Sequence, residues 1–155
     1  MIGNLDRVQS EYEKILQAPK FNNPTDRSMI MNNLAYAMAL NGKGNKAMEW
    51  VNKAKDELRD SADLIDTRGY VYYSMGETDK AISEFTRAID KGVKSPQKLF
   101  HLAMAYHKKG NRDSARVNWE EALSIGLSRY GLPPSLRSKF DELLGAYGGT
   151  PVAQR

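Results

Sequence analysis

The stretch LIDTRGYVYYSMGETDKAISEFTRAID, residues 64–90, decides the fold because it joins two helical patterns around one glycine. Its first part repeats at the i, i+3, i+4, i+7 spacing of a single helix face, in Ile65, Arg68, Gly69 and Tyr72. Its second part carries a small, large, small series on one face, in Ala81, Phe85 and Ala88. Gly76 lies between them and suits the left-handed conformation that ends a helix. The stretch predicts a helix-turn-helix unit.

The same unit recurs at a fixed period along the chain. Three segments of 34 residues align without gaps, namely Ser28 to Ser61, Ala62 to Ser95 and Pro96 to Arg129. The glycine and the triplet keep their register in the first and third segments, as Gly42 with Ala47, Val51 and Ala54, and as Gly110 with Ala115, Trp119 and Ala122. Such self-similarity is the signature of stacked repeats.

The pattern resembles the tetratricopeptide repeat in residues 64–90 and again in KLFHLAMAYHKKGNRDSARVNWEEAL, residues 98–123. The three repeats cover 102 of the 155 residues. The resemblance implies an all-α fold, a right-handed α-α superhelix, or TPR-like solenoid, of antiparallel helix pairs.

Two features depart from the family pattern. Arg68 stands where the other repeats have Leu34 and Leu102, and the usual proline at the end of the second helix is absent. We expect Arg68 to extend its head out of the interface or to pair with an acid.

The repeats are expected to lie within a single domain, residues 1–155, with flanking helices. Residues 1–27 form a helix and linker that resemble half a repeat, 28–61, 62–95 and 96–129 are the repeats, 130–147 a capping helix and 148–155 a mobile tail. The first helix has an apolar face of Val8, Tyr12, Ile15 and Leu16. Pro19 and Pro24 break the chain before the next helix, for which Thr25 or Asp26 is the expected N-cap. The capping helix has an apolar side of Leu136, Phe140, Leu143, Leu144 and Tyr147.

A half-unit at the start and a cap at the end leave two interpretations open. The chain is either the last part of a longer solenoid or a complete small protein whose first helix caps the stack. An exposed apolar face at Val8 and Tyr12 would also allow a homodimer through the N-terminal end.

Composition excludes several classes of function. The chain is 41% hydrophobic and 27% charged, and no apolar run approaches the roughly 20 residues of a membrane helix. The absence of Cys excludes disulfides and thiol catalysis. His101 and His107 are six apart, about 120° around a helix, so they cannot jointly ligate a metal. We therefore expect no enzyme and no cofactor. No signal peptide is recognisable, which makes a cytoplasmic location the default.

The resemblance implies that the first helices of the repeats line an inner groove. The side chains that would face this groove are Asn32, Tyr36, Asp63, Asp66, Tyr70, Tyr73, Phe100, Met104, His107 and Lys108. Aromatic rings are typical binding anchors, and an Asn amide can bond a peptide backbone. A carboxylate clamp known in some relatives is not expected, since Asn32, Tyr36 and Asp66 occupy the corresponding row.

The sequence therefore predicts a non-enzymatic protein-protein interaction module or scaffold that binds a peptide or helix in this groove. Two alternatives remain. The chain could be a structural or dimerising segment of a larger repeat protein, or a helical-repeat RNA binder, since all of the excess positive charge follows residue 95. A net charge of only +4 disfavours nucleic acid as a partner.

Overall fold

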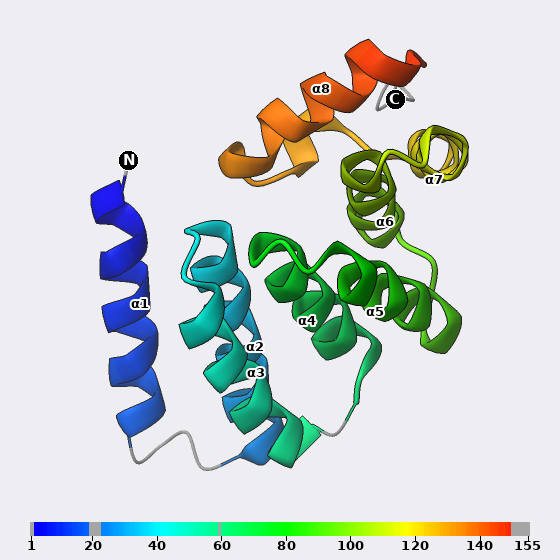
Figure 1. Cartoon of the computed structure of the whole chain (residues 1–155). Helices are drawn as coiled ribbons and strands as arrows, with labels where there is room; N and C mark the ends of the chain where they lie inside the picture. The colour runs from blue at the N-terminus through cyan, green and yellow to red at the C-terminus, as the bar shows by residue number, and fades with distance from the viewer. Residues whose placement is uncertain (1, 19–22, 59, 150–155) are drawn as a thin grey trace. The chain divides into compact units, whose positions relative to one another are not determined.

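A computed structural model describes residues 2–18, 23–58 and 60–149 of the chain (Figure 1). Within these residues the secondary structure is helical and contains no strand, so the prediction of an all-α fold is confirmed. The chain divides into two compact units, Met1–Glu77 and Thr78–Arg155, called unit 1 and unit 2 below. None of the described helices is both long and apolar enough to cross a membrane.

Unit 1 contains α1 (Ile2–Gln17), α2 (Pro24–Leu40), α3 (Gly44–Leu58) and α4 (Ala62–Ser74). Helix α2 is its centre, because it packs against α1, α3 and α4, while α3 also contacts α4. The core of this unit is built mainly from aliphatic side chains that are fully buried: Leu34, Ala35, Ala47, Val51, Ala54, Leu64 and Ile65. Helices α2, α3 and α4 thus share one core in unit 1.

The start of α2 differs from the prediction that Thr25 or Asp26 would be its N-cap. The N-cap is Asn23, whose side chain accepts a hydrogen bond of 2.9 Å from the backbone N–H of Thr25. Pro24 occupies the first position of the helix, where its missing N–H leaves no intrahelical bond unmade. The prediction was wrong because Pro24 is an N-terminal residue of the helix and not a breaker before it.

Unit 2 contains α5 (Thr78–Lys91), α6 (Pro96–Lys109), α7 (Arg112–Ser124), the 3-10 turns η1 (Arg129–Gly131) and η2 (Pro134–Leu136), and α8 (Arg137–Tyr147). Helix α6 packs against α5 and α7, and α8 contacts both α6 and α7. The largest fully buried side chains of this unit are aromatic: Phe85, Phe100, Trp119 and Phe140.

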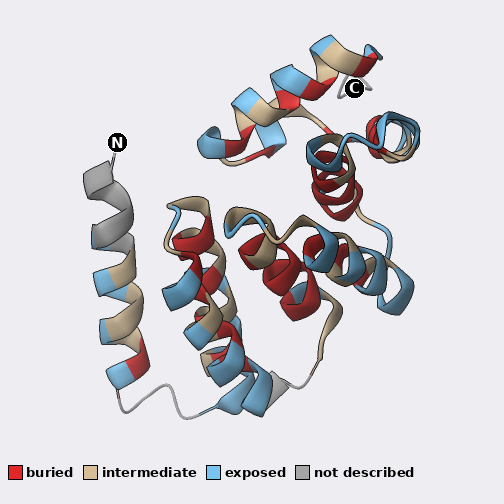
Figure 2. Cartoon of the chain, viewed as in Figure 1, coloured by how far each residue is buried: buried red, intermediate tan, exposed pale blue. Residues whose placement is uncertain are grey.

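The repeat register of the sequence is confirmed in the backbone and in the packing. Gly42, Gly76 and Gly110 have φ of +73°, +82° and +83°, the left-handed region that glycine adopts without strain. All nine residues of the three small, large, small triplets are fully buried. Figure 2 shows the middle turns of α4 and α6 as continuously buried, in contrast to the exposed outer sides of α3 and α5.

Arg68 pairs with an acid, as one of the two sequence expectations has it. Its Nη1 lies 3.4 Å from Oδ1 of Asp60, and the residue is 9% exposed. An ion pair therefore keeps a buried helix position compatible with a charge.

The C-terminal segment forms the amphipathic helix that the sequence predicts, after two short 3-10 turns. Leu136, Phe140, Leu143 and Tyr147 are buried, while Leu144 is partly exposed. Of the tail predicted to be mobile, residues 150–155 lie outside the described residues, as does the side chain of Val8 in the first helix.

Candidate functional site

Three tyrosines from two helices of unit 1 lie against one another. The rings of Tyr36 on α2 and Tyr70 on α4 meet edge to face, with centroids 5.1 Å apart and planes at 67°. Tyr73, almost one turn after Tyr70 on α4, lies 5.8 Å from it at 38°. Tyr36 and Tyr70 hold the same register in successive repeats, 34 residues apart, so the stacking of α2 beside α4 brings them together. The repeat geometry thus builds an aromatic cluster.

The three rings differ in their exposure. Tyr70 is only 7% exposed, whereas Tyr36 and Tyr73 are partly exposed. Burial raises the pKa of the Tyr70 hydroxyl above its ordinary value of 10.0, and the nearby Tyr73 raises it further. Tyr70 is therefore neutral and packed into the protein. Its two neighbours, Tyr36 and Tyr73, present part of their aromatic surface to solvent.

Asn32 lies one turn before Tyr36 on α2 and presents an unusual amide. Its side-chain oxygen, Oδ1, is buried and has no hydrogen-bond partner among the described residues. Leaving a buried acceptor unsatisfied costs about 1–3 kcal/mol, so such an atom needs an explanation.

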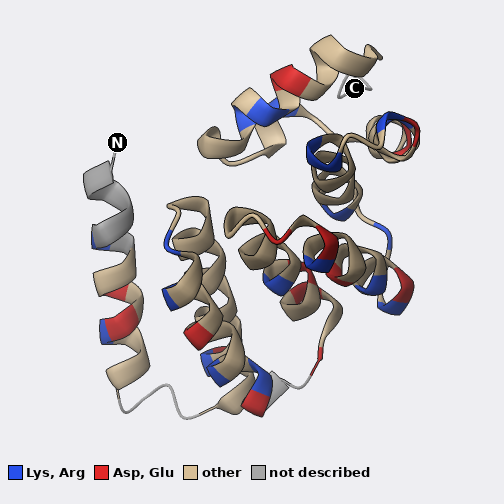
Figure 3. Ribbon diagram, viewed as in Figure 1, with Lys and Arg blue, Asp and Glu red and all other residues tan. Residues whose placement is uncertain are grey.

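The charged residues of this face are acids. Asp63 is exposed in the first turn of α4, and Asp66, almost one turn later, is 8% exposed; both also interact within the protein. Helix α2 carries no charged residue after Arg27, whereas α3 carries both signs (Figure 3). Six predicted groove residues lie on α2 and α4, where ring contacts join the three tyrosines. We call this set the tyrosine face: Asn32, Tyr36, Asp63, Asp66, Tyr70 and Tyr73.

The four predicted groove residues of unit 2 have other surroundings. Phe100 and Met104 are 0% and 2% exposed, and the Phe100 ring packs 6.2 Å from Trp119 and 6.4 Å from Phe140. Lys108 is exposed. Phe100 and Met104 thus belong to the core of unit 2 in this structure.

His107, the remaining predicted residue, contacts the capping helix α8. Its Nδ1 lies 2.7 Å from the hydroxyl oxygen of Tyr147, and its Nε2 lies 3.2 Å from Oε1 of Glu142. The rings of His107 and Tyr147 also meet edge to face at 5.5 Å. The imidazole therefore links the C-terminal end of α6 to α8 through these contacts.

Two polar residues beside the predicted ones in the sequence have different surroundings. His101 is fully buried with its ring 5.4 Å from Phe85. Asn33 is exposed, whereas the side-chain oxygen of Asn32 is buried. Consecutive residues differ by about 100° around a helix, which separates the two amides. No group of three metal-ligating side chains occurs in the part of the chain that the structure describes.

Comparison with known proteins identifies the repeat. Residues 62–90 match the family model of the tetratricopeptide repeat. These residues therefore carry one tetratricopeptide repeat. A search of curated proteins gave no match. Among solved structures, the chain is similar to the crystal structure of PcrH in complex with the chaperone-binding region of PopB. That similarity has a TM-score of 0.58 at 17% identity and covers 77% of this chain and 95% of the other, so the two share a fold.

Proposed function

We propose that this tetratricopeptide-repeat chain is a protein-interaction module whose tyrosine face binds a peptide segment of a partner. The observation that carries the proposal is the tyrosine cluster on α2 and α4, in which Tyr36 and Tyr73 are partly exposed. No catalytic step is part of the proposal.

The chemistry of the face suits a peptide. The partly exposed Asn32 side chain offers an amide group to the backbone of the segment, and the rings of Tyr36 and Tyr73 cover an apolar side chain. Aromatic side chains contribute large contact area with little entropy to lose, which is why they dominate many interfaces. Exposed Asp63 at the start of α4 favours a basic residue in the partner.

The comparisons support a peptide partner. The repeat matched at residues 62–90 includes α4, the helix that carries four of the six residues of the tyrosine face. PcrH, which shares the fold, is described in complex with a binding region of PopB, that is, with a segment of another protein. The helices of the face are formed before binding, so little ordering free energy is lost when a peptide docks.

Paired substitutions test the proposal. Peptides selected on an array against the full chain are measured by titration calorimetry with the parent and with Asn32→Ala and Tyr36→Ala. We expect Asn32→Ala to weaken binding about two- to tenfold, the value of one hydrogen bond, and Tyr36→Ala about 30-fold, as for an aromatic anchor. The matched controls are Asn33→Ala, on the same turn of α2, and Tyr130→Ala, at an 81% exposed ring of unit 2.

The controls decide how the result is interpreted. Both control variants should bind as the parent does. If no peptide binds the full chain, or if Asn33→Ala and Tyr130→Ala weaken binding as much as the paired changes do, the tyrosine face is not the binding site. Circular dichroism of every variant establishes that each is folded before its affinity is compared.

A further inference from the structure

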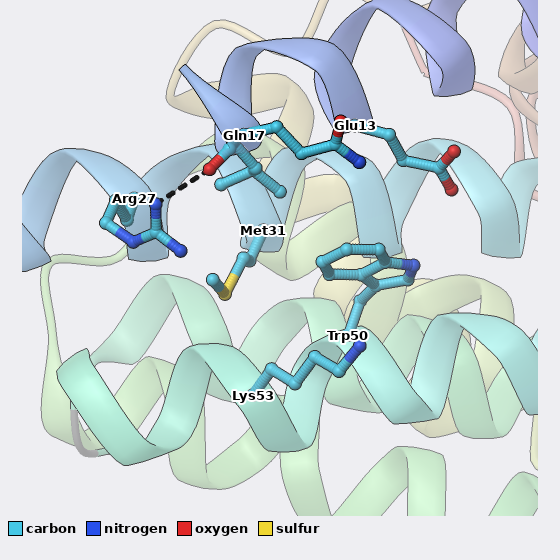
Figure 4. A pocket seen from close by; sticks show the side chains of 7 residues that line it. Glu13, Gln17, Arg27, Met31, Trp50 and Lys53 are labelled. Carbon is cyan, nitrogen blue, oxygen red and sulfur yellow. Dashed lines mark hydrogen bonds between the residues drawn. The ribbon is translucent and has the colours of Figure 1, made fainter. Parts of the chain in front are cut away.

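Unit 1 contains a second site that the tyrosine face does not use. A pocket of about 350 Å³ lies where α1, α2 and α3 meet, and Figure 4 shows the side chains around it. Its lining residues are Glu13, Leu16, Gln17, Arg27, Met31, Trp50 and Lys53. Leu16 and Met31 are buried, while Trp50 is partly exposed. The pocket therefore combines an apolar floor with an aromatic wall, at the size of small binding pockets.

The repeat itself does not require the residues that make this pocket distinctive. In the 34-residue register, Trp50 corresponds to Glu84 and Asn118. A polar residue therefore serves at this position in the other repeats, and an indole is not needed to pack one unit of the fold. Packing within the repeat therefore does not explain why position 50 carries a large aromatic side chain.

Arg27, on the side of the pocket opposite Trp50, also departs from the repeat pattern. Arg27 corresponds to Ser61 and Ser95, which are the N-caps of α4 and α6. In the first repeat Asn23 provides the cap, four residues earlier, and position 27 is instead a cation inside α2. Its Nη1 donates a hydrogen bond of 2.8 Å to the backbone oxygen of Leu16, which holds the guanidinium at the pocket.

The charges around the pocket are unequal. Arg27 and Lys53 contribute two cations, and the Nζ of Lys53 lies 4.3 Å from the centre of the Trp50 ring. Among the described lining residues Glu13 is the one carboxylate, and its Oε1 already accepts a hydrogen bond of 3.0 Å from the side-chain amide of Gln9. A ligand that enters beside Trp50 therefore meets net positive charge, which favours an acidic group.

We propose that this pocket binds a large apolar side chain of a partner peptide whose neighbouring residue is acidic. The apolar side chain lies between Met31 and the Trp50 ring, and the carboxylate of its neighbour lies toward Lys53 and Arg27. The site is separate from the tyrosine face, because it uses Arg27 and Met31 of α2, while the face uses Asn32 and Tyr36. Each site can therefore fail a test without affecting the other.

The two tryptophans of the chain allow a direct test with an internal control. In a proton–nitrogen correlation spectrum each indole N–H gives one signal. Trp119 is fully buried, and its Nε1–H donates to the backbone oxygen of Gly148 at 2.7 Å. The probe is the capped dipeptide N-acetyl-phenylalanyl-aspartyl amide, titrated into the full chain. The expected result is a saturable shift of the Trp50 signal, assigned by its loss in Trp50→Phe, while the Trp119 signal stays in place.

Two further probes test the two halves of the ligand. The phenylalanyl-lysyl analogue should bind several-fold more weakly, because it brings a cation to the two cations of the rim. The glycyl-aspartyl analogue should leave the Trp50 signal unmoved, because it lacks the apolar side chain. An unmoved Trp50 signal with the first probe, equal shifts with all three, or equal shifts of both indoles would overturn the proposal.

A matched pair of variants tests the role of charge. Lys53→Gln should weaken binding of the phenylalanyl-aspartyl probe about two- to fivefold, the range of an exposed ion pair, and should leave the affinity for the lysyl analogue unchanged or improved. The control is Lys46→Gln, which removes an exposed cation from the same helix outside the pocket. Equal effects of Lys53→Gln and Lys46→Gln would show that the pocket does not recognise the carboxylate.

Discussion

The two units use aromatic residues in opposite ways. Unit 2 fully buries four aromatic rings, Phe85, Phe100, Trp119 and Phe140, and Trp119 meets Phe140 edge to face at 5.0 Å. Unit 1 has a mainly aliphatic core, and several of its aromatic rings lie at two surfaces. Tyr36 and Tyr73 are partly exposed beside Tyr70, and Trp50 borders the pocket.

The difference shows what the repeat fixes and what it leaves free. The central position of the triplet is Val51 in unit 1 and Phe85 and Trp119 in unit 2, so the volume of the core differs at one register. Close packing requires this position to be filled but does not prescribe an aromatic residue. Where an aliphatic residue fills the core, rings at other positions are available for recognition. We therefore expect ring deletions to destabilise unit 2 and to alter binding in unit 1.

The largest expected effect comes from deleting the buried indole. Trp119→Ala removes a fully buried ring that packs on Phe100 and Phe140 and bonds to Gly148, and it should lower the free energy of unfolding by about 3–5 kcal/mol. Urea unfolding followed by circular dichroism at 222 nm measures this change.

Trp50→Ala is the matched deletion in unit 1. Because Trp50 is partly exposed, its loss should lower the free energy of unfolding by about 1 kcal/mol or less. Similar losses for Trp119→Ala and Trp50→Ala would contradict the proposed division between a structural and a recognition role.

A smaller effect is expected where the capping helix joins unit 2. Tyr147→Phe removes the hydroxyl that lies 2.7 Å from Nδ1 of His107 but keeps the ring, over which Arg112 and Arg116 lie at 5.7 Å. The loss of one hydrogen bond should lower the free energy of unfolding by about 0.5–1.5 kcal/mol in the same urea assay. Tyr130→Phe, at an exposed ring of the same unit, should leave stability unchanged, and an equal loss there would show that the His107 contact is not what Tyr147 contributes.

The fold could be predicted in detail because its information is periodic. A glycine and a small, large, small triplet recur every 34 residues. The glycine ends a helix and the triplet marks a buried helix face, and their spacing is enough to predict both. The N-terminus of α2 was mispredicted because Pro24 is compatible with either a break or a first turn. The side chain of Asn23 decides between them by bonding the N–H of Thr25.

The candidate site could be predicted only in part. Spacing places Tyr36 and Tyr70 at equivalent positions, so their meeting follows from the stacking of α2 and α4. The same register would place Met104 beside them as a groove residue, yet it is 2% exposed. Burial depends on neighbours distant in sequence, as the packing of Phe140 against Phe100 shows, and a periodic pattern does not contain that information. The pocket beside Trp50 was missed for the same reason, because α1 lies outside the repeat.

The smallest effect expected of the tyrosine cluster appears only at alkaline pH. Burial raises the pKa of Tyr70 above 10.0, so the unfolded chain loses this proton more readily than the folded chain does. The resulting contribution to stability is fully present below pH 10 and is lost as the pH rises toward the folded pKa. Tyr70→Phe has no such proton, and its free energy of unfolding should therefore fall less steeply above pH 10 than that of the parent. Tyr130→Phe, an exposed ring of unit 2, serves as the control in pH-dependent urea unfolding, and equal slopes for Tyr70→Phe and the parent would show that Tyr70 is not held neutral by the cluster.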